Sequence, residues 1–154
     1  MKSLRPLLIA LFLVSFSVSA EESVDQAFDK DVLVIAARDA CHRFDIYLAL
    51  SHAQQRRGLM RVRDMPSSTG MLFVYPVEDY RSMWMKNTFI PLDILFAKSD
   101  GSVSSIAKNT VPQSLQSITS TERVMFVLEL NAGTSDRLAI EPGSVLIWDY
   151  QGPY

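Results

Sequence analysis

The feature that most constrains the fold is an alternation of large apolar side chains along two short segments. Between Arg123 and Leu130 every second residue is apolar and large, and the same holds between Phe44 and Leu50. A period of two places successive side chains on opposite faces of an extended chain, which is typical of a strand with one buried face. In the first segment most intervening residues are apolar too, which predicts burial on both faces near its centre.

Further strands are expected between turn signals. Pro76 is expected to end one of them, Asp100-Gly101 indicates a hairpin, and Glu141-Pro142-Gly143 indicates a turn before the last strand. These further expected strands cover residues 32–35, 71–75, 83–88, 93–98 and 145–148.

One short helix is expected near residues 51–57. Ser51 and Gln54 have the spacing of a capping box, in which each side chain satisfies a free backbone N–H of the other residue. Arg57 suits the C-terminal turn, and Gly58 suits the residue that ends the helix. Seven or eight short strands with one helix predict a mainly β domain, either a β-sandwich or a barrel-like sheet.

The first twenty residues have the layout of a secretory signal peptide. Two basic residues precede an apolar run from Leu7 to Val18, and small residues lead to Ala20. A bilayer span needs roughly 20 apolar residues, so this shorter run favours cleavage near Ala20 over an uncleaved anchor. We therefore expect a periplasmic or secreted protein with no stable membrane span after cleavage. A flexible tail at residues 21–30 and one domain at 31–154 are expected to follow.

The charge balance argues against nucleic acid as a partner. The chain has 15 Lys and Arg against 17 Asp and Glu, a formal net charge of −2. Phosphate binding needs clustered basic side chains, and the local basic cluster at residues 56–63 is expected to be a solvated helix end and turn.

The sequence contains no familiar catalytic or cofactor motif, and it implies neither a cofactor nor a metal centre. It lacks His-Glu-x-x-His, Cys-x-x-Cys, a glycine-rich phosphate loop and a Gly-x-Ser-x-Gly elbow, and its two histidines are His42 and His52. Cys41 is the single cysteine. It is expected to be a small buried residue, with an intermolecular disulfide or a reactive thiolate as the alternatives.

A candidate ligand site follows from the segment that begins at Trp84. On a regular strand Trp84, Lys86 and Thr88 would share one face, where the indole could stack on a small polar ligand. Asn87 belongs to the same segment, and the Asp93 carboxylate could pair with Lys86.

Glu129 is a further candidate because it lies inside a strongly apolar strand. An acid in that position is either on a solvated sheet face or a perturbed group with a functional role.

Three functions stay open, and no catalytic residue is assigned. The first is an extracytoplasmic binding or accessory domain for an unknown small molecule or envelope component. The second is an envelope-associated hydrolase that uses Asp93 or Glu129 as acid or base. The third is periplasmic copper handling, because five methionines fall between residues 60 and 85 and soft thioethers select Cu(I). Methionine also fills irregular gaps in protein cores, which is the alternative for this cluster.

A set of short motifs occurs in order along the chain, namely Arg57-Gly58-Leu59-Met60, Gly70-Met71-Leu72-Phe73-Val74, Trp84-Met85-Lys86-Asn87-Thr88, Ile90-Pro91-Leu92-Asp93-Ile94-Leu95-Phe96, Val127-Leu128-Glu129-Leu130 with Ala132-Gly133, and Gly143-Ser144-Val145-Leu146. In these motifs the sequence resembles the DUF192 family over roughly residues 31–150. The resemblance implies a compact, mainly β single-domain fold, often exported, with a short helix ahead of a Gly-Leu-Met motif. It implies no activity and assigns no catalytic residues, because this is a family of unknown function.

Overall fold

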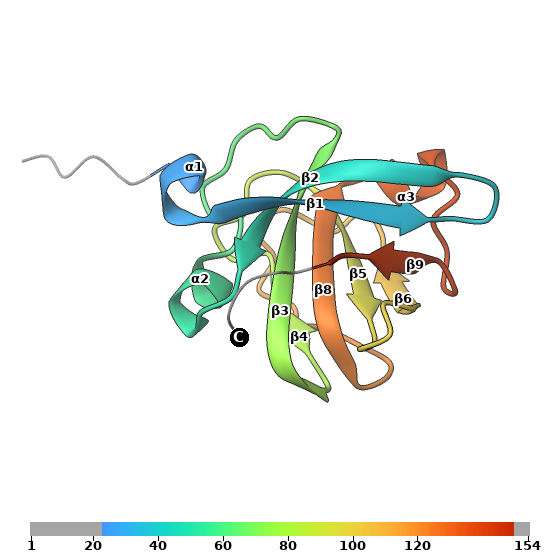
Figure 1. The fold of residues 1–154 in the computed structure, drawn as a ribbon. Helices are drawn as coiled ribbons and strands as arrows, with labels where there is room; N and C mark the ends of the chain where they lie inside the picture. The colour runs from blue at the N-terminus through green and yellow to red at the C-terminus, as the bar shows by residue number, and fades with distance from the viewer. Residues whose placement is uncertain (1–22, 150–154) are drawn as a thin grey trace, which may run out of the picture.

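A computed structural model describes residues 23–149 of the chain (Figure 1). The predicted signal peptide lies outside these residues. Within them the elements follow in the order α1 (Val24–Ala27), β1 (Asp29–Ala36), β2 (Cys41–Ala49), α2 (His52–Arg57), β3 (Thr69–Asp79), β4 (Ser82–Met83), β5 (Leu92–Ala97), β6 (Val103–Ala107), β7 (Ile118–Thr119), β8 (Val124–Asn131), α3 (Thr134–Arg137) and β9 (Val145–Ile147).

Seven of the strands form one curved sheet in the order β6-β5-β8-β3-β2-β1-β9 (Figure 1). All neighbours are antiparallel except β2 and β3, which run parallel and are joined through α2. The two edges of the sheet meet, since Ser102 bridges Val145 and the Leu146 N–H donates to the Gly101 carbonyl over 2.8 Å. The sheet is therefore a nearly closed barrel, which confirms the mainly β prediction in its barrel-like form.

The predicted Asp100-Gly101 hairpin joins β5 to β6 at this closure. Gly101 has φ +82°, in the left-handed region that favours glycine. A Cβ at Gly101 would also collide with the backbone carbonyl oxygen of Leu146 on the opposite edge. Glycine is thus needed both for the turn and for the close approach of the two edges.

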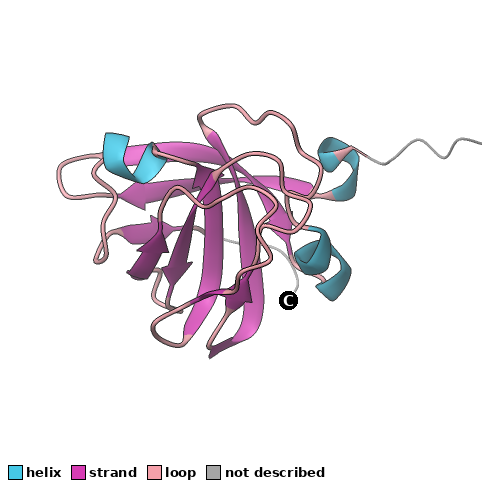
Figure 2. Cartoon of the chain, turned by 180° about the vertical axis from the view of Figure 1, so that it is seen from behind, coloured by secondary structure: helices cyan, strands magenta, loops and turns pink. Residues whose placement is uncertain are grey.

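The sheet separates two groups of buried side chains. One group receives residues from all seven strands, Leu33, Leu72 and Leu128 among them, and fills the barrel interior. The other lies on the outer face, where long loops run across the strands (Figure 2). Strand β8 contributes to both groups, with Leu128 in the interior and Val127 on the outer face. This confirms that β8 is buried on both faces.

Strand β3 continues through Pro76, contrary to the prediction that this proline ends it. Proline cannot donate to a sheet ladder, but the β3–β8 register shifts between Val74 and Asp79. The pairing with β2 ends earlier, at Phe73. No ladder hydrogen bond is therefore required from the Pro76 nitrogen, and the strand tolerates it.

The N-terminal part of the domain also differs from the predicted tail. Residues 23–30 form α1 and the start of β1. Phe28 is 4% exposed and packs edge-on against Tyr47, with 6.5 Å between ring centroids. Burial of this aromatic ring holds the segment against the sheet.

Cys41 is exposed, contrary to the prediction of a buried thiol. It is the first residue of β2 and pairs with Ala36, the last residue of β1, at the end of their ladder. A residue at the end of a hairpin ladder has fewer neighbours to cover it. In the described part of the chain, no helix is long and apolar enough to cross a bilayer.

Candidate functional site

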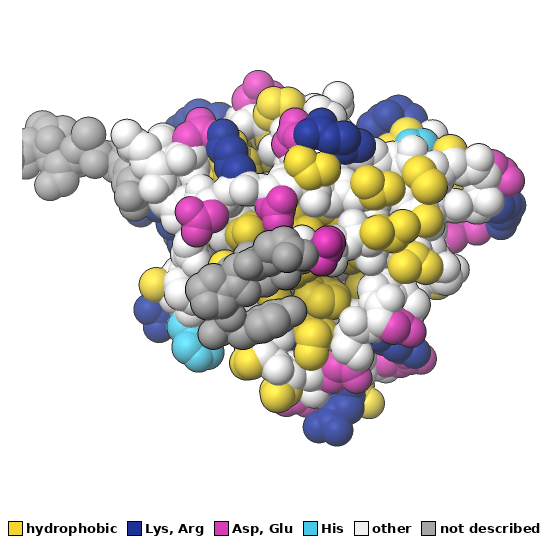
Figure 3. All heavy atoms as spheres, in the orientation of Figure 1, with side chains coloured by type: hydrophobic (Ala, Val, Ile, Leu, Met, Phe, Trp, Pro, Cys, Tyr) yellow, Lys and Arg dark blue, Asp and Glu magenta, His cyan; other side chains and the backbone are white. Residues whose placement is uncertain are grey.

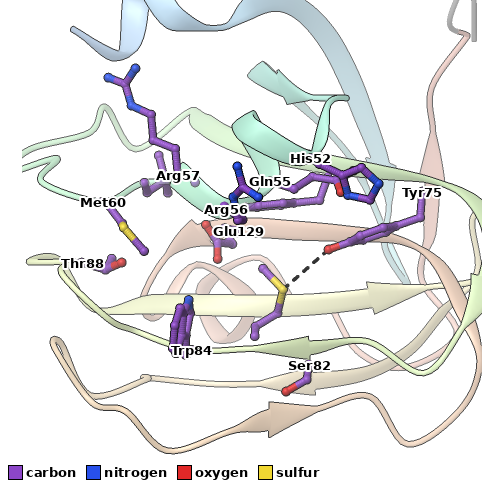
Figure 4. A pocket seen from close by; sticks show the side chains of 14 residues that line it. His52, Gln55, Arg56, Arg57, Met60, Tyr75, Ser82, Trp84, Thr88 and Glu129 are labelled. Carbon is purple, nitrogen blue, oxygen red and sulfur yellow. Dashed lines mark hydrogen bonds between the residues drawn. The ribbon is translucent and has the colours of Figure 1, made fainter. Parts of the chain in front are cut away.

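An open pocket of about 220 Å³ lies on the outer face of the sheet (Figure 4). Helix α2 forms one side of it, and β4 with the residue that follows forms the opposite side. Strands β3 and β8 contribute the side chains between these two walls. The lining residues are His52, Gln55, Arg56, Arg57, Gly58, Leu59, Met60, Phe73, Tyr75, Ser82, Met83, Trp84, Thr88 and Glu129.

Glu129 is the acidic residue of this lining. Its place in β8 is opposite Met71 and Ile94, and the alternation of β8 directs its side chain to the same face as Val127. The residue is 4% exposed, and no described group donates a hydrogen bond to its carboxyl. Burial raises the pKa of Glu129 to about 8, so this carboxyl is mostly protonated at neutral pH.

Helix α2 is held over the pocket by its caps. The Ser51 hydroxyl accepts from the Gln54 N–H over 3.3 Å, and the Gln54 side chain accepts from the Ser51 N–H over 3.0 Å. This confirms the predicted capping box. The Gln55 amide then ties the helix to β3 by donating to the Val74 carbonyl over 2.8 Å. Gly58 ends the helix with φ +47° and donates its N–H to the Gln54 carbonyl.

The two arginines of α2 differ in their surroundings. The Arg57 guanidinium lies 5.4 Å from the centre of the Phe28 ring and points away from Glu129 (Figure 4). Arg56 is exposed on the pocket side of α2 and forms no ion pair with another described residue. The mouth of the pocket therefore carries a guanidinium that can meet a ligand.

Aromatic and thioether groups form much of the remaining wall. The Tyr75 hydroxyl donates to the Met83 sulfur over 3.9 Å, and burial raises the pKa of this tyrosine. Arg81 stacks over the Tyr75 ring at 3.9 Å from its centre. Trp84 is 48% exposed at the rim, and the Lys86 ammonium lies 5.0 Å from the centre of its ring.

The segment after β4 is a turn, and the predicted strand at residues 83–88 is wrong beyond Met83. Asn87 has φ +56°, and the Thr88 N–H donates to the Met85 carbonyl over 3.0 Å. Strand β4 pairs only with the two-residue β7, so no longer ladder opposes this local turn. Trp84 and Thr88 consequently reach the pocket from a turn and do not share a strand face.

The structure brings three of the six predicted site residues together, namely Trp84, Thr88 and Glu129. Lys86 is exposed and lies against Trp84 without lining the pocket, and the Asn87 carbonyl accepts from the Arg61 N–H over 2.8 Å. Glu129 is buried, so the alternative of a solvated sheet face is wrong for this residue.

Asp93 lies in a separate buried cluster. It is 0% exposed, and its two oxygens accept the backbone N–H groups of Asn109 and Ser135, each over 2.9 Å. These bonds anchor the chain after β6 and the start of α3. Asp93 does not line the pocket, and no ion pair joins it to Lys86 among the described residues.

Sequence reasoning missed the residues that α2 and β3 contribute, above all Arg56 and Tyr75. The helix and the strand were both predicted, but the β3–β8 pairing that sets Tyr75 on the same face as Glu129 joins segments about fifty residues apart. A period-two pattern assigns faces within a strand and does not identify its neighbours.

The five clustered methionines divide between core and pocket. Met71 and Met85 are 0% exposed and Met65 is 6% exposed, all three in the outer-face core. Met60 and Met83 line the pocket. Among the described residues no group of three or more His, Cys, Asp or Glu side chains is placed to hold a metal ion. This distribution favours core packing for most of the cluster.

Fold and pocket together define a small barrel-like β domain with an open pocket on its outer face. The chain belongs to the DUF192 family, described as "Uncharacterized ACR", whose family model matches residues 33–148. The family resemblance found in the motifs is thereby confirmed. Comparison with curated proteins gave no significant match.

Two solved structures are similar to this chain along nearly all of their own length. A protein from Sinorhizobium meliloti 1021, provisionally described as a transcription regulator, is 41% identical with a TM-score of 0.76, over 78% of this chain and 94% of that one. A protein of unknown function from Novosphingobium aromaticivorans DSM 12444 is 30% identical with a TM-score of 0.75, over 84% of this chain and 100% of that one.

Proposed function

We propose that this chain is an extracytoplasmic domain that binds a small molecule in the Glu129 pocket. The observation that carries the proposal is a buried carboxyl that faces an open pocket with no described hydrogen-bond donor to it. Buried polar groups are normally hydrogen-bonded, and exceptions indicate strain, function or an absent partner. A ligand with a hydrogen-bond donor would satisfy the Glu129 carboxyl. The Trp84 side chain at the rim would then cover the ligand.

The extracytoplasmic location rests on the first twenty residues, whose layout is that of a signal peptide. A small-molecule ligand is favoured over nucleic acid, although one relative is provisionally described as a transcription regulator. The net charge of the chain is −2, and basic and acidic side chains are interspersed on the face seen in Figure 3. Nucleic-acid binding instead uses a concentrated basic surface.

A Trp84→Ala variant tests the pocket as the ligand site. Amines, amino acids, sugars and short peptides are screened by thermal shift, and the Kd of each hit is measured by calorimetry. Loss of the indole is expected to weaken binding about tenfold, the equivalent of about 1.4 kcal/mol of aromatic contact. Tyr80→Ala is the matched control, because Tyr80 is 60% exposed and does not line the pocket. Equal affinities in the two variants would place the ligand elsewhere and contradict the proposal.

A second candidate is hydrolysis with Glu129 as general acid. It is favoured by the pKa of Glu129 at about 8, which keeps a proton available for donation at neutral pH. Asp93 is less suited to this role, because both of its oxygens already accept backbone N–H groups. Copper handling receives less support, since the pocket contains only Met60 and Met83 of the cluster.

For the hydrolase candidate, turnover of envelope-derived substrates is expected to fall as pH rises through about 8 and Glu129 ionises. Glu129→Gln is expected to lower kcat by about 100-fold or more, the usual contribution of a general acid. The measurement is a pH–rate profile of both proteins. Unchanged turnover in Glu129→Gln would remove this candidate.

A further inference from the structure

We propose that the ligand is a small zwitterion whose protonated nitrogen pairs with Glu129 and whose anionic group meets Arg56. This inference rests on the proposed function and adds the chemical class of the ligand. It follows from the charges at the two ends of the pocket, from the character of the wall between them and from the pocket's volume.

The inner end of the pocket favours a protonated nitrogen. Glu129 is 4% exposed and its carboxyl has no described hydrogen-bond partner, so a cation with N–H donors can pair with the ionised carboxylate and satisfy its oxygens together. A hydroxyl or amide would supply a donor but leave the ionised form of the buried carboxylate without a counter-charge.

The wall beside Glu129 consists of aromatic and thioether side chains. Tyr75 and Trp84 line the pocket, and each ring lies against a cation of the chain, Arg81 at 3.9 Å and Lys86 at 5.0 Å from the ring centres. The Met83 thioether also lines this side of the pocket. These rings and the thioether give apolar contact area to the part of the ligand between its two charged groups.

The mouth of the pocket favours an anionic group. Arg56 lines it, is exposed and forms no ion pair with a described residue, whereas Arg57 lies over Phe28. In Figure 4 Arg56 lies on the α2 side of the pocket and Trp84 on the opposite side, with Glu129 between them. A ligand with only a positive charge would be repelled by Arg56, and one with only a negative charge would leave the ionised form of Glu129 without a counter-charge.

The volume of the pocket limits the ligand to the size of an amino acid or a compound slightly larger. At about 220 Å³ it is smaller than the roughly 300–1,000 Å³ of sites that enclose drug-sized molecules. The test therefore uses linear ω-amino acids, from glycine to 6-aminohexanoate, which vary the separation of the two charges. Pentylamine and pentanoate match 5-aminopentanoate in length, and each lacks one of its charged groups.

The experiment is calorimetry on the purified protein, with NMR mapping of the binding site. The best zwitterion is expected to bind at least tenfold more tightly than the amine or the acid alone. Glu129→Gln and Arg56→Gln are each expected to weaken it by about 10- to 100-fold, the range of a charge-assisted hydrogen bond. Arg43→Gln is the matched control for Arg56, since Arg43 is exposed on β2 and outside the pocket.

Affinity is also expected to rise with pH and to level off above about 8, because the ammonium binds the ionised form of Glu129. The other titratable or charged groups of the lining are His52, Arg56 and Arg57 on α2 and Tyr75 on β3. His52→Gln should leave this pH dependence in place, whereas Glu129→Gln should remove it.

Two outcomes would overturn the inference. The first leaves the proposed function intact, and the second contradicts it as well. If zwitterions bind no better than pentylamine or pentanoate while an uncharged compound binds in a Trp84-dependent manner, the ligand class is wrong and the pocket remains the site. If zwitterions bind but their NMR contacts lie outside the pocket, both the ligand class and the site are wrong.

Discussion

Glu129→Gln is expected to stabilise the folded domain, by an amount that grows between pH 5 and pH 8. Glutamate ionises near 4.5 in the unfolded chain, whereas burial raises the pKa of Glu129 to about 8 in the folded one. Between these values the unfolded state binds fewer protons than the folded state, so the free energy of unfolding falls as pH rises. At about 1.4 kcal/mol per pKa unit, the wild type loses up to about 5 kcal/mol across this interval.

The measurement is urea denaturation of wild type and Glu129→Gln at pH 5, 6, 7 and 8. The two proteins are expected to agree within about 1 kcal/mol at pH 5, where the carboxyl is neutral and of similar shape to the amide. The variant should then become progressively more stable than the wild type. Glu122→Gln is the control, since Glu122 is an exposed residue paired with Lys98. A constant difference between wild type and Glu129→Gln at all four pH values would show that Glu129 is solvated.

Asp93→Asn is expected to lower the free energy of unfolding by about 2–4 kcal/mol. Both carboxylate oxygens of Asp93 accept backbone N–H groups, from Asn109 and Ser135, at a position with no exposed surface. An asparagine keeps one acceptor oxygen and turns an NH2 group toward the other N–H. One buried donor is then left without a partner, and a buried hydrogen bond to a charged group is lost.

Urea denaturation at neutral pH measures this loss, and Asp45→Asn provides the comparison. Asp45 is more than half exposed and pairs with Arg43 on the surface, so its substitution is expected to cost less than about 1 kcal/mol. If Asp93→Asn were as stable as the wild type yet inactive against a substrate, Asp93 would be catalytic and not structural. That result would restore the hydrolase candidate based on Asp93.

Much of the fold could be predicted because its signals are local. Period-two alternation located β2 and β8, and the Ser51–Gln54 spacing located α2 together with its cap. Asp100-Gly101 located the β5–β6 hairpin, where Gly101 takes the positive φ that the turn needs. In each case the sequence signal lies within the element that it predicts.

The errors occurred where distant segments decide the local structure. Strand β3 passes through Pro76 because β8 shifts register there, and that neighbour could not be known from residues 71–79. The segment after Met83 reads as a strand, but only the two-residue β7 is available to pair with β4. Phe28 holds residues 23–30 against the sheet through its contact with Tyr47.

The candidate site could be predicted only in part, because its residues have local signals but their convergence does not. Glu129 was identified as an acid in an apolar strand, and Trp84 as an indole that could stack on a small polar ligand. Their convergence depends on how α2 and the turn after β4 pack on β8, which no local pattern specifies. Asp93 was predicted as a possible partner of Lys86, yet its oxygens are occupied by backbone N–H groups. Only the three-dimensional contacts distinguish the acid in the pocket from the acid in the core.

The most direct test of the central claim is the pKa of Glu129 itself, measured by 13C NMR of its side-chain carboxyl in the ligand-free protein. A titration midpoint near 8 is predicted, because the carboxyl is buried in the pocket without a hydrogen-bond partner among the described residues. Glu129→Gln identifies the resonance by its disappearance. A midpoint near 4.5 would mean that the carboxyl is solvated or already paired. It would contradict the proposal that Glu129 is an unpaired group that binds the ligand.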